Sequence, residues 1–147
     1  MTRSITWRQF DRNSRADLKL IERICRESGS PAVAAHAAYL RTAIWQTAAR
    51  PENLWCEIAD GVAFYMCRRC RAHIRGVDTA VLSEYHGMGY GRALHERRLA
   101  RMRAAGIDLF TFRTSRDNSA LGFWLHMGAR IMDVVGGDYE MEIRLNG

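Results

Sequence analysis

The sequence predicts a single α/β (α+β) domain over residues 1–147, in which about four helices flank a mixed, mostly antiparallel twisted sheet of about six or seven strands. Three observations support this prediction. Asp60-Gly61 is a strong hairpin signal between two apolar segments. A glycine-rich segment at 86–92 separates a strand pattern from a helix pattern. At 147 residues, the chain is long enough for one domain with a buried core.

In the first half, alternation of apolar residues predicts a strand at 4–10. Residues 14–17 (SRAD) resemble a capping box and predict a helix that Gly29 ends. Ser30-Pro31 has the cap and first-turn residues of a second helix, which we expect to run to about residue 48. Helices at 16–28 and 32–48 are therefore expected to follow the first strand.

The centre of the chain reads as three successive strands. Segments 54–59 and 62–67 flank the hairpin turn, and a third strand is expected at 72–82 with a bend at Gly76. The second half continues the pattern. Its expected elements are a helix at 90–105, a strand at 107–114, a short helix from 118 or 119 to about 128, and strands at 129–135 and 139–145 around a Gly136-Gly137 turn.

The glycine-rich segment, HGMGYGR at 86–92, is the most informative local feature. Glycines at a strand-to-helix junction let the backbone approach a ligand closely and direct N–H groups toward the helix entrance. Such a junction is an anion site, and a phosphate-bearing cofactor is its natural occupant. The spacing matches neither the dinucleotide pattern GxGxxG nor a Walker loop.

The net charge is +6, and Lys19 is the only lysine among 22 cationic side chains. The arginine excess has two readings: a coding bias, or recognition of a phosphate-rich partner such as a polyanionic cofactor or nucleic acid. No apolar run approaches the ~20 residues of a membrane span, and the start lacks the apolar core of a secretory signal. We therefore expect a cytoplasmic protein.

Four cysteines occur, and Cys67-Arg68-Arg69-Cys70 is followed by His73. This spacing is compatible with half a zinc site, but no second ligand pair accompanies it. Free thiols are the favoured reading, and no metal is expected.

Two sequence blocks resemble the GCN5-related N-acetyltransferase superfamily. The first is VLSEYHGMGYG at 81–91, similar to the family's Val-x-Pro-Glu-Tyr and Gln/Arg-x-x-Gly-x-Gly/Ala motifs, with Ser83 in place of Pro and His86 in place of Gln or Arg. The second is NSALGFWLHMGA at 118–129, similar to Asn-x-x-Ala…Phe-Tyr-x-x-x-Gly-Phe. The expected element order resembles the family's over nearly the whole chain.

The resemblance implies that acetyl-CoA, or another acyl-CoA, is a co-substrate. Its diphosphate would bind backbone N–H groups of the glycine-rich segment, and its pantetheine arm would pair with the fourth strand where the fourth and fifth strands separate. The cofactor-binding residues that it implies are Ala80, Val81, Leu82, His86, Gly87, Met88, Gly89, Tyr90, Gly91, Arg92, Asn118 and Trp124.

Attack of an amine on a thioester needs a proton acceptor, an oxyanion donor and an acid for the thiolate. The resemblance implies that a backbone N–H near Val81 polarises the carbonyl. The candidate catalytic side chains are Asp78, Glu84 and Tyr139, with Glu57 as a further carboxylate. The family often uses a tyrosine as the acid, and Trp124 stands in its place. Tyr139, Tyr85 and His126 are the substitutes, and the sequence does not choose among them.

Arg97 falls inside a face of the long helix formed by Tyr90, Ala93, Leu94, Ala100 and Ala104. Because a buried unpaired charge is very costly, we predict that it snorkels, meets a carboxylate or faces a phosphate.

Three functions remain open from sequence. The first is transfer of an acyl group to an amine of a small molecule or protein. The second is acylation of nucleic acid, at a base amine or a charged tRNA, which the arginines and aromatics favour. The third is a non-catalytic CoA-binding module, which Trp124 favours. The resemblance alone suggests a homodimer.

Overall fold

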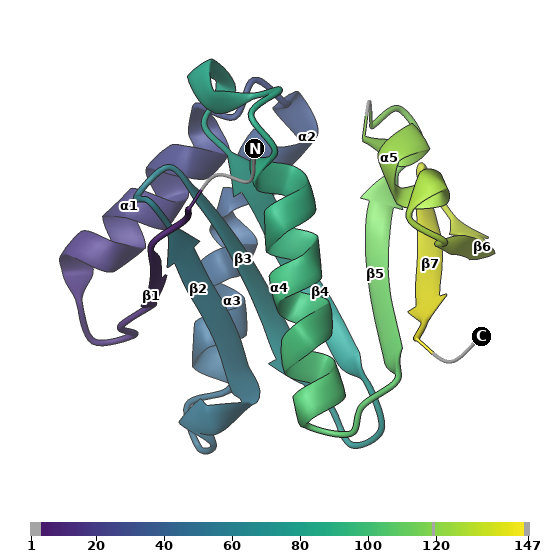
Figure 1. Cartoon of the computed structure of the whole chain (residues 1–147), viewed down its shortest axis with the longest axis horizontal. Coiled ribbons are helices and arrows are strands. Elements are labelled where there is room, and N and C mark those ends of the chain that lie inside the picture. Colours follow the sequence, from purple (N-terminus) through teal and green to yellow (C-terminus); the bar gives the residue numbers. More distant parts are fainter. Residues whose placement is uncertain (1–3, 119, 146–147) are drawn as a thin grey trace.

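The computed structural model describes residues 4–118 and 120–145. Its strands are β1 (Trp7–Gln9), β2 (Leu54–Ala59), β3 (Ala63–Arg69), β4 (Ile74–Val81), β5 (Leu109–Ser115), β6 (Arg130–Val135) and β7 (Asp138–Arg144). Its α-helices are α1 (Arg15–Arg26), α2 (Pro31–Ala35), α3 (Ala37–Gln46), α4 (Tyr90–Ala104) and α5 (Leu121–His126), with short 3-10 turns at Pro51–Asn53 and Ser83–Tyr85. The predicted α/β class is confirmed (Figure 1).

The seven strands form one sheet in the order β1-β2-β3-β4-β5-β7-β6. Neighbouring strands run antiparallel except β4 and β5, which are parallel and pair only at Ile74 with Phe110 and at Arg75 with Thr111. Beyond these two positions the strands separate, so β5, β7 and β6 fan away from β4 (Figure 1). The rest of β4 therefore pairs with a neighbouring strand on its β3 side only, within the described residues.

Two apolar cores cover the two faces of the sheet. Helix α4 packs on β3 and β4 over a core that includes Tyr65, Leu94 and Phe110. Helices α1 and α3 cover the opposite face, over a core that includes Ile21 and Phe64 (Figure 1). Strand β2 is buried throughout, as a strand between two covered faces must be.

The predicted cap of α1 is confirmed: the Ser14 hydroxyl accepts from the Asp17 N–H at 3.2 Å. Ser30 caps α2 in the same way, accepting from the Val33 N–H at 3.3 Å. The expected single helix at 32–48 is wrong, because the chain forms two helices that join at His36. There the His36 N–H reaches both Ala32 O and Val33 O, and the Tyr39 N–H bonds His36 O, so the backbone tightens into a 3-10 turn.

The hairpin and the bend are both as predicted. Asp60 and Gly61 have positive φ values of 52° and 70°, as a tight hairpin turn requires. In β4, Asp78 lies opposite Met66 while Gly76 lies opposite Cys67, so the register shifts at Val77. This bulge lies next to the point at which β4 separates from β5.

The buried face of α4 differs from the predicted one. Ala100 and Ala104 are exposed, and the face that packs on the sheet carries Leu94, Arg98 and Met102. Arg97 lies at the margin, where its guanidinium donates to both oxygens of Glu57 at 3.1 and 2.9 Å. The predicted pairing of Arg97 with a carboxylate is thus confirmed, and the arginine that is fully buried is its neighbour.

None of the helices in the described residues has the length and apolar character needed to cross a membrane. Strand β6 forms one edge of the sheet and is exposed along its whole length.

Candidate active site

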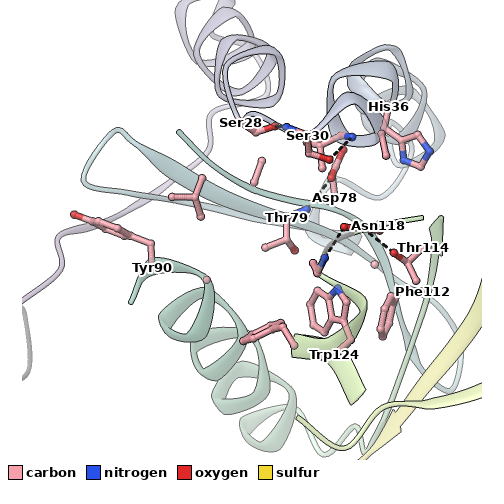
Figure 2. Close-up of a pocket in the computed structure, with 18 of the residues that line it drawn as sticks. Ser28, Ser30, His36, Asp78, Thr79, Tyr90, Phe112, Thr114, Asn118 and Trp124 are labelled. Atoms are coloured by element: carbon pink, nitrogen blue, oxygen red, sulfur yellow. Dashed lines mark hydrogen bonds between the residues drawn. The ribbon is translucent and has the colours of Figure 1, made fainter. Parts of the chain in front are cut away.

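The separation of β4 from β5 opens a cleft of about 480 Å³. Its walls are the unpaired part of β4, the glycine-rich segment, the carboxyl end of β5 and the start of α5, with the α1–α2 corner above (Figure 2). Phe110, Phe112 and Trp124 form an apolar floor, and the rings of Phe112 and Trp124 lie 4.6 Å apart. A mostly apolar cleft with a few polar groups is typical of a small-molecule site.

The glycine-rich segment turns sharply at the mouth of this cleft. Gly87 and Gly89 have φ values of 76° and 88°, and Gly89 is the N-cap of α4 in the left-handed conformation. Glycine adopts this conformation without steric cost. The first-turn N–H groups of a helix have no partner within the helix, and the dipole favours an anion beside them. The local geometry therefore fits a phosphate group.

Strand alternation decides which β4 amides face the cleft. The Leu82 N–H donates to Val62 O at 2.9 Å, on the β3 side. Since successive amides of a strand point to opposite sides, the N–H groups of Val81 and Thr79 point toward the unpaired side. The Thr79 N–H donates to the Asp78 carboxylate at 2.9 Å, while the His86 Nε2 donates to Val81 O at 3.0 Å.

Asp78 is the carboxylate of the cleft. Its side chain points toward the α1–α2 corner (Figure 2). The Cys25 thiol donates to its Oδ2 at a long 3.9 Å. Burial raises the pKa of Asp78 to about 7, although the hydrogen bonds from Thr79 and Cys25 act in the opposite direction. A carboxylate with its pKa near neutral is suited to accept a proton at physiological pH.

The α5 end of the cleft carries two residues of the second sequence block. The Asn118 side chain donates to the Thr114 hydroxyl at 2.9 Å and accepts from the Ala120 N–H at 2.8 Å (Figure 2). Asn118 therefore holds β5 to the start of α5, and its amide has a second N–H besides the one that it donates to Thr114. Trp124 lies on the cleft floor, at the position where the family resemblance suggested an acid.

Most of the sequence-predicted residues come together at this cleft. Those that line it are Asp78, Ala80, Val81, His86, Gly87, Gly89, Tyr90, Gly91, Asn118 and Trp124. Leu82 is buried in the core beneath α1 and α3, Met88 is exposed, and the exposed Arg92 lies 3.6 Å from Glu96. Side chains at these three positions do not line the cleft, and the Leu82 N–H is already bound to Val62 O on the β3 side.

The other predicted catalytic residues lie elsewhere. Glu84 is exposed in a 3-10 turn outside the cleft lining. Tyr139 is half-buried on β7, with the Arg116 guanidinium 5.5 Å from its ring centre. Glu57 faces α4, where Tyr65 donates to it at 2.6 Å. Burial would raise the pKa of Glu57, but the hydrogen bonds from Arg97 and Tyr65 outweigh it and the pKa is lowered.

The cysteines show no metal geometry. Cys67 is buried and Cys70 is half-buried, both as free thiols, and Cys70 forms a turn by donating its N–H to His73 O at 2.9 Å. Across residues 4–118 and 120–145, no group of three or more His, Cys, Asp or Glu is placed to hold a metal ion.

Sequence reasoning missed a polar cluster directly behind the cleft floor. Arg98 and His95 are fully buried on α4, and Arg98 donates to the Thr79 hydroxyl at 3.2 Å. The signal was present: Tyr90, Leu94, Arg98 and Met102 are spaced by four residues, which places Arg98 on the packed face of the helix.

Comparison with known proteins agrees with this geometry. The acetyltransferase (GNAT) family profile matches residues 18–129. No curated protein sequence matches the chain. Among solved structures, the PaiA N-acetyltransferase of Thermoplasma acidophilum in complex with coenzyme A superimposes with a TM-score of 0.77 at 19% identity, over 97% of this chain and 99% of that chain.

Two further structures show the same fold. The ribosomal-protein-S18-alanine N-acetyltransferase of Escherichia coli has a TM-score of 0.74 at 15% identity, over 97% of this chain and 94% of that one. Ard1 of Thermoplasma volcanium has a TM-score of 0.74 at 20% identity, over 96% and 97%. The fold and the family match define the class: the chain belongs to the acetyltransferase (GNAT) family. It is an acyl-CoA-dependent N-acetyltransferase.

Proposed function

We propose that this enzyme transfers an acetyl or related acyl group from CoA to an amine of a small molecule or protein, with Asp78 as the general base. The observation that carries the proposal is the position of Asp78. Its carboxylate lines the cleft on the unpaired part of β4, and its pKa is raised to about 7 by burial.

The acyl-CoA would bind along the unpaired part of β4. Amides of residues 87–92 would hold its diphosphate at the entrance of α4, with Arg92 adding charge. The β4 segment at Ala80, Val81 and Leu82 would guide the pantetheine arm, and the second N–H of Asn118 would contact that arm. The Val81 N–H would polarise the acyl carbonyl, because strand alternation turns it toward the cleft.

The acceptor would approach from the α1–α2 corner, where Ser28, Ser30 and His36 line the cleft around Asp78. Asp78 in its ionised form would take the proton that the amine loses as it attacks the acyl carbon. A raised pKa makes Asp78 a better proton acceptor than an exposed carboxylate while leaving it ionised above pH 7.

The proposed acceptor is an amine, either of a small molecule or of a protein. Among the structural neighbours, one is named for the alanine of a ribosomal protein, and another is the NatC complex bound to Gag peptide and CoA. These names support a protein amine as one acceptor to test. Acylation of nucleic acid is the alternative that the same assay addresses.

The test is thiol release from acetyl-CoA in the presence of primary amines, peptides with free N-termini, or polynucleotides. With an active acceptor, Asp78→Asn is expected to lower kcat by about 100-fold to 10,000-fold. Asp108→Asn, an exposed carboxylate at the start of β5, is the matched control and keeps full activity.

Three results would contradict the proposal. A loss in Glu84→Gln or Tyr139→Phe that equals the loss in Asp78→Asn would move the base away from Asp78. Activity with polynucleotides alone would replace the proposed acceptor, and tight CoA binding with no thiol release for any acceptor would favour the non-catalytic module.

A further inference from the structure

Arg98 is a buried cation to which the described residues present no carboxylate partner. It is 0% exposed, and its guanidinium lies 4.0 Å from the ring centre of Phe110 and 5.6 Å from that of Trp124. It donates to the Thr79 hydroxyl at 3.2 Å and to His95 Nδ1 at 2.7 Å and also interacts with the Cys67 thiol, while its Nε has no hydrogen-bond partner in the described residues. Burying such a charge costs free energy, so we looked for a function of Arg98 at this position.

The positive charge of this cluster resides on Arg98 alone. Because Arg98 donates to Nδ1 of His95, that nitrogen carries no proton and the proton sits on Nε2. Burial lowers the pKa of His95 to about 3, and the neighbouring Arg98 charge adds to the effect. His95 is therefore neutral at physiological pH. Its Nε2 is buried and without a hydrogen-bond partner in the described part of the chain.

Arg98 lies directly behind the end of the cleft that Thr79 lines. Of the side chains that Arg98 contacts, Thr79, Phe110 and Trp124 line the cleft, whereas His95 and Cys67 do not. The glycine-rich segment forms the opposite, open end. A CoA molecule held there by its diphosphate must direct its thiol end along β4 toward Thr79, because pairing of β4 with β5 closes the cleft beyond.

The hydroxyl of Thr79 connects the buried Arg98 guanidinium to the cleft through hydrogen bonds. A hydroxyl has one proton and two acceptor lone pairs. Since the oxygen of Thr79 accepts from Arg98, its single proton is left to donate toward the cleft. Donation to an anion is strengthened when the same oxygen accepts from a cation, because hydrogen bonds in a chain polarise one another.

We propose that Thr79, backed by the buried charge of Arg98, stabilises the CoA thiolate that leaves during acyl transfer. This inference rests on the proposed function. As the amine nitrogen bonds to the acyl carbon, the carbon–sulfur bond breaks and its electron pair goes to sulfur, while the amine proton goes to Asp78. Thr79 donates a hydrogen bond to the sulfur, and Arg98 is the positioning residue behind it.

Stabilisation of the thiolate by Thr79 and Arg98 fits a protein that has Trp124 at the position where the family often has an acidic tyrosine. The N–H of Trp124 cannot supply a proton to a thiolate, so the leaving sulfur needs another source of stabilisation. A fixed charge in a water-poor site provides it without a proton transfer.

The prediction concerns the ionisation of bound CoA, which no acceptor amine is needed to measure. We compare the affinity of CoA with that of S-methyl-CoA, which cannot ionise at sulfur, by calorimetry between about pH 6.5 and pH 8.5. A thiol has an ordinary pKa of about 8.5. If binding favours the thiolate, the preference for CoA grows with pH, by about tenfold across this range for a thiol pKa lowered by one to two units.

The groups around Arg98 do not titrate in this range. Strand β3 presents Tyr65 and Cys67, whose pKa values burial raises, to about 11 for Cys67. Helix α4 presents His95, with its pKa near 3. Thr79, Phe110 and Trp124, from β4, β5 and α5, carry no charge. The ionisable groups on the cleft itself are Asp78, His36, His86, Tyr85, Tyr90 and Arg113. Their effects on the part that the two ligands share cancel in the ratio of affinities. Asp78 ionises within this range, because its pKa is about 7, and its charge disfavours a nearby thiolate, so it acts against the expected trend.

Variants locate the effect. Thr79→Val and Arg98→Met are expected to reduce the pH-dependent preference for CoA to within about twofold, while Thr79→Ser restores it. Methionine fills the space of Arg98 with an apolar chain, and replacement of a buried charge in this way is often tolerated. The two Thr79 variants keep the test valid if Arg98→Met does not fold.

The outcomes separate the two proposals. An affinity ratio that stays constant with pH in the wild type, or that Thr79→Val leaves intact, overturns the role of Thr79 and Arg98 while acyl-CoA binding stands. Binding of neither ligand overturns the proposed function together with this inference.

Discussion

Gly76 lies against the ring of Phe110 at the point where β4 and β5 begin to separate. A Cβ on Gly76 would be 2.8 Å from Cζ of Phe110 and 3.1 Å from Cβ of Phe112. No real Cβ occupies such a position, so this glycine lets two aromatic side chains form the floor of the cleft. The shape of the site therefore depends on the absence of a side chain on β4.

Gly76→Ala is expected to lower the free energy of unfolding by about 1–3 kcal/mol, because Phe110 must leave its place over Arg98. Chemical denaturation measures this loss. Gly122→Ala is the control, since a Cβ there meets nothing within 4 Å and alanine favours the helix α5. Equal stability of Gly76→Ala and wild type would show that the rings of Phe110 and Phe112 can move to make room for the added methyl group.

Asp78 makes stability depend on pH in a defined direction. Its pKa is about 7 in the folded chain and about 4 in an unfolded one. A raised carboxyl pKa stabilises the fold at low pH, and this contribution is lost as pH rises from about 4 through 7. Asp78→Asn is therefore expected to be more stable than wild type at pH 8, by about 1–4 kcal/mol. Denaturant titrations at pH 5 and pH 8 measure this difference in the free energy of unfolding. A wild type more stable than Asp78→Asn at pH 8 would contradict the burial of this charge.

The rate of the enzyme is expected to follow the same ionisation. With Asp78 as the base, kcat/KM rises with pH and levels above an apparent pKa near 7. Asp78→Asn removes that limb of the profile from the residual activity. A limb that persists unchanged in the variant would assign it to another group.

Arg97 and Glu57 form an ion pair that sets the pKa of a nearly buried carboxylate. In wild type the lowered pKa of Glu57 gives stability that is present above pH 4 and lost as pH falls through the folded value. Arg97→Met removes the two hydrogen bonds that Arg97 donates to Glu57, and only the one from Tyr65 then opposes the effect of burial on the pKa of Glu57. The pKa of Glu57 then rises, and we expect a loss of about 1–3 kcal/mol at pH 7, discounted because Arg97 is half-exposed.

The double variant Arg97→Met/Glu57→Gln is the control for this prediction. Removal of both charges should restore most of the stability, because no unpaired buried carboxylate remains. A double variant as unstable as Arg97→Met would mean that Arg97 acts through its packing against Trp7, 5.0 Å from its guanidinium, instead.

The role of the left-handed Gly89 in acyl-CoA binding can be tested by comparison with Gly136, a second glycine with positive φ that lies away from the cleft. Gly89→Ala, at φ 88°, should distort the entrance of α4 and raise the KM for acetyl-CoA by about tenfold or more. Gly136→Ala, at φ 60° in the exposed β6–β7 turn, carries comparable backbone strain away from the cleft and should leave that KM unchanged. Equal KM values for the two variants would remove the glycine-rich segment from acyl-CoA binding.

Local sequence was enough to predict most elements and the sharp turn of the glycine-rich segment that lines the cleft. The Asp60-Gly61 turn, the Ser14 cap and the glycine-rich junction at 86–92 are each determined by a few neighbouring residues, since φ preference and capping act over one turn of chain. The division at His36 could not be predicted in this way. An alanine-rich segment favours a continuous helix, and packing of both α2 and α3 against α1 accompanies the break.

By itself, the sequence determined most of the order of elements, the glycine-rich junction between β4 and α4, and the presence of a carboxylate on the fourth strand. Tertiary structure decided which carboxylate faces the cleft and which arginine lies buried behind it. Helix α4 carries only a few large apolar side chains, so periodicity could not choose its buried face. Burial, which raises the pKa of Asp78 and confines the charge of Arg98, arises only when residues distant in sequence exclude water together.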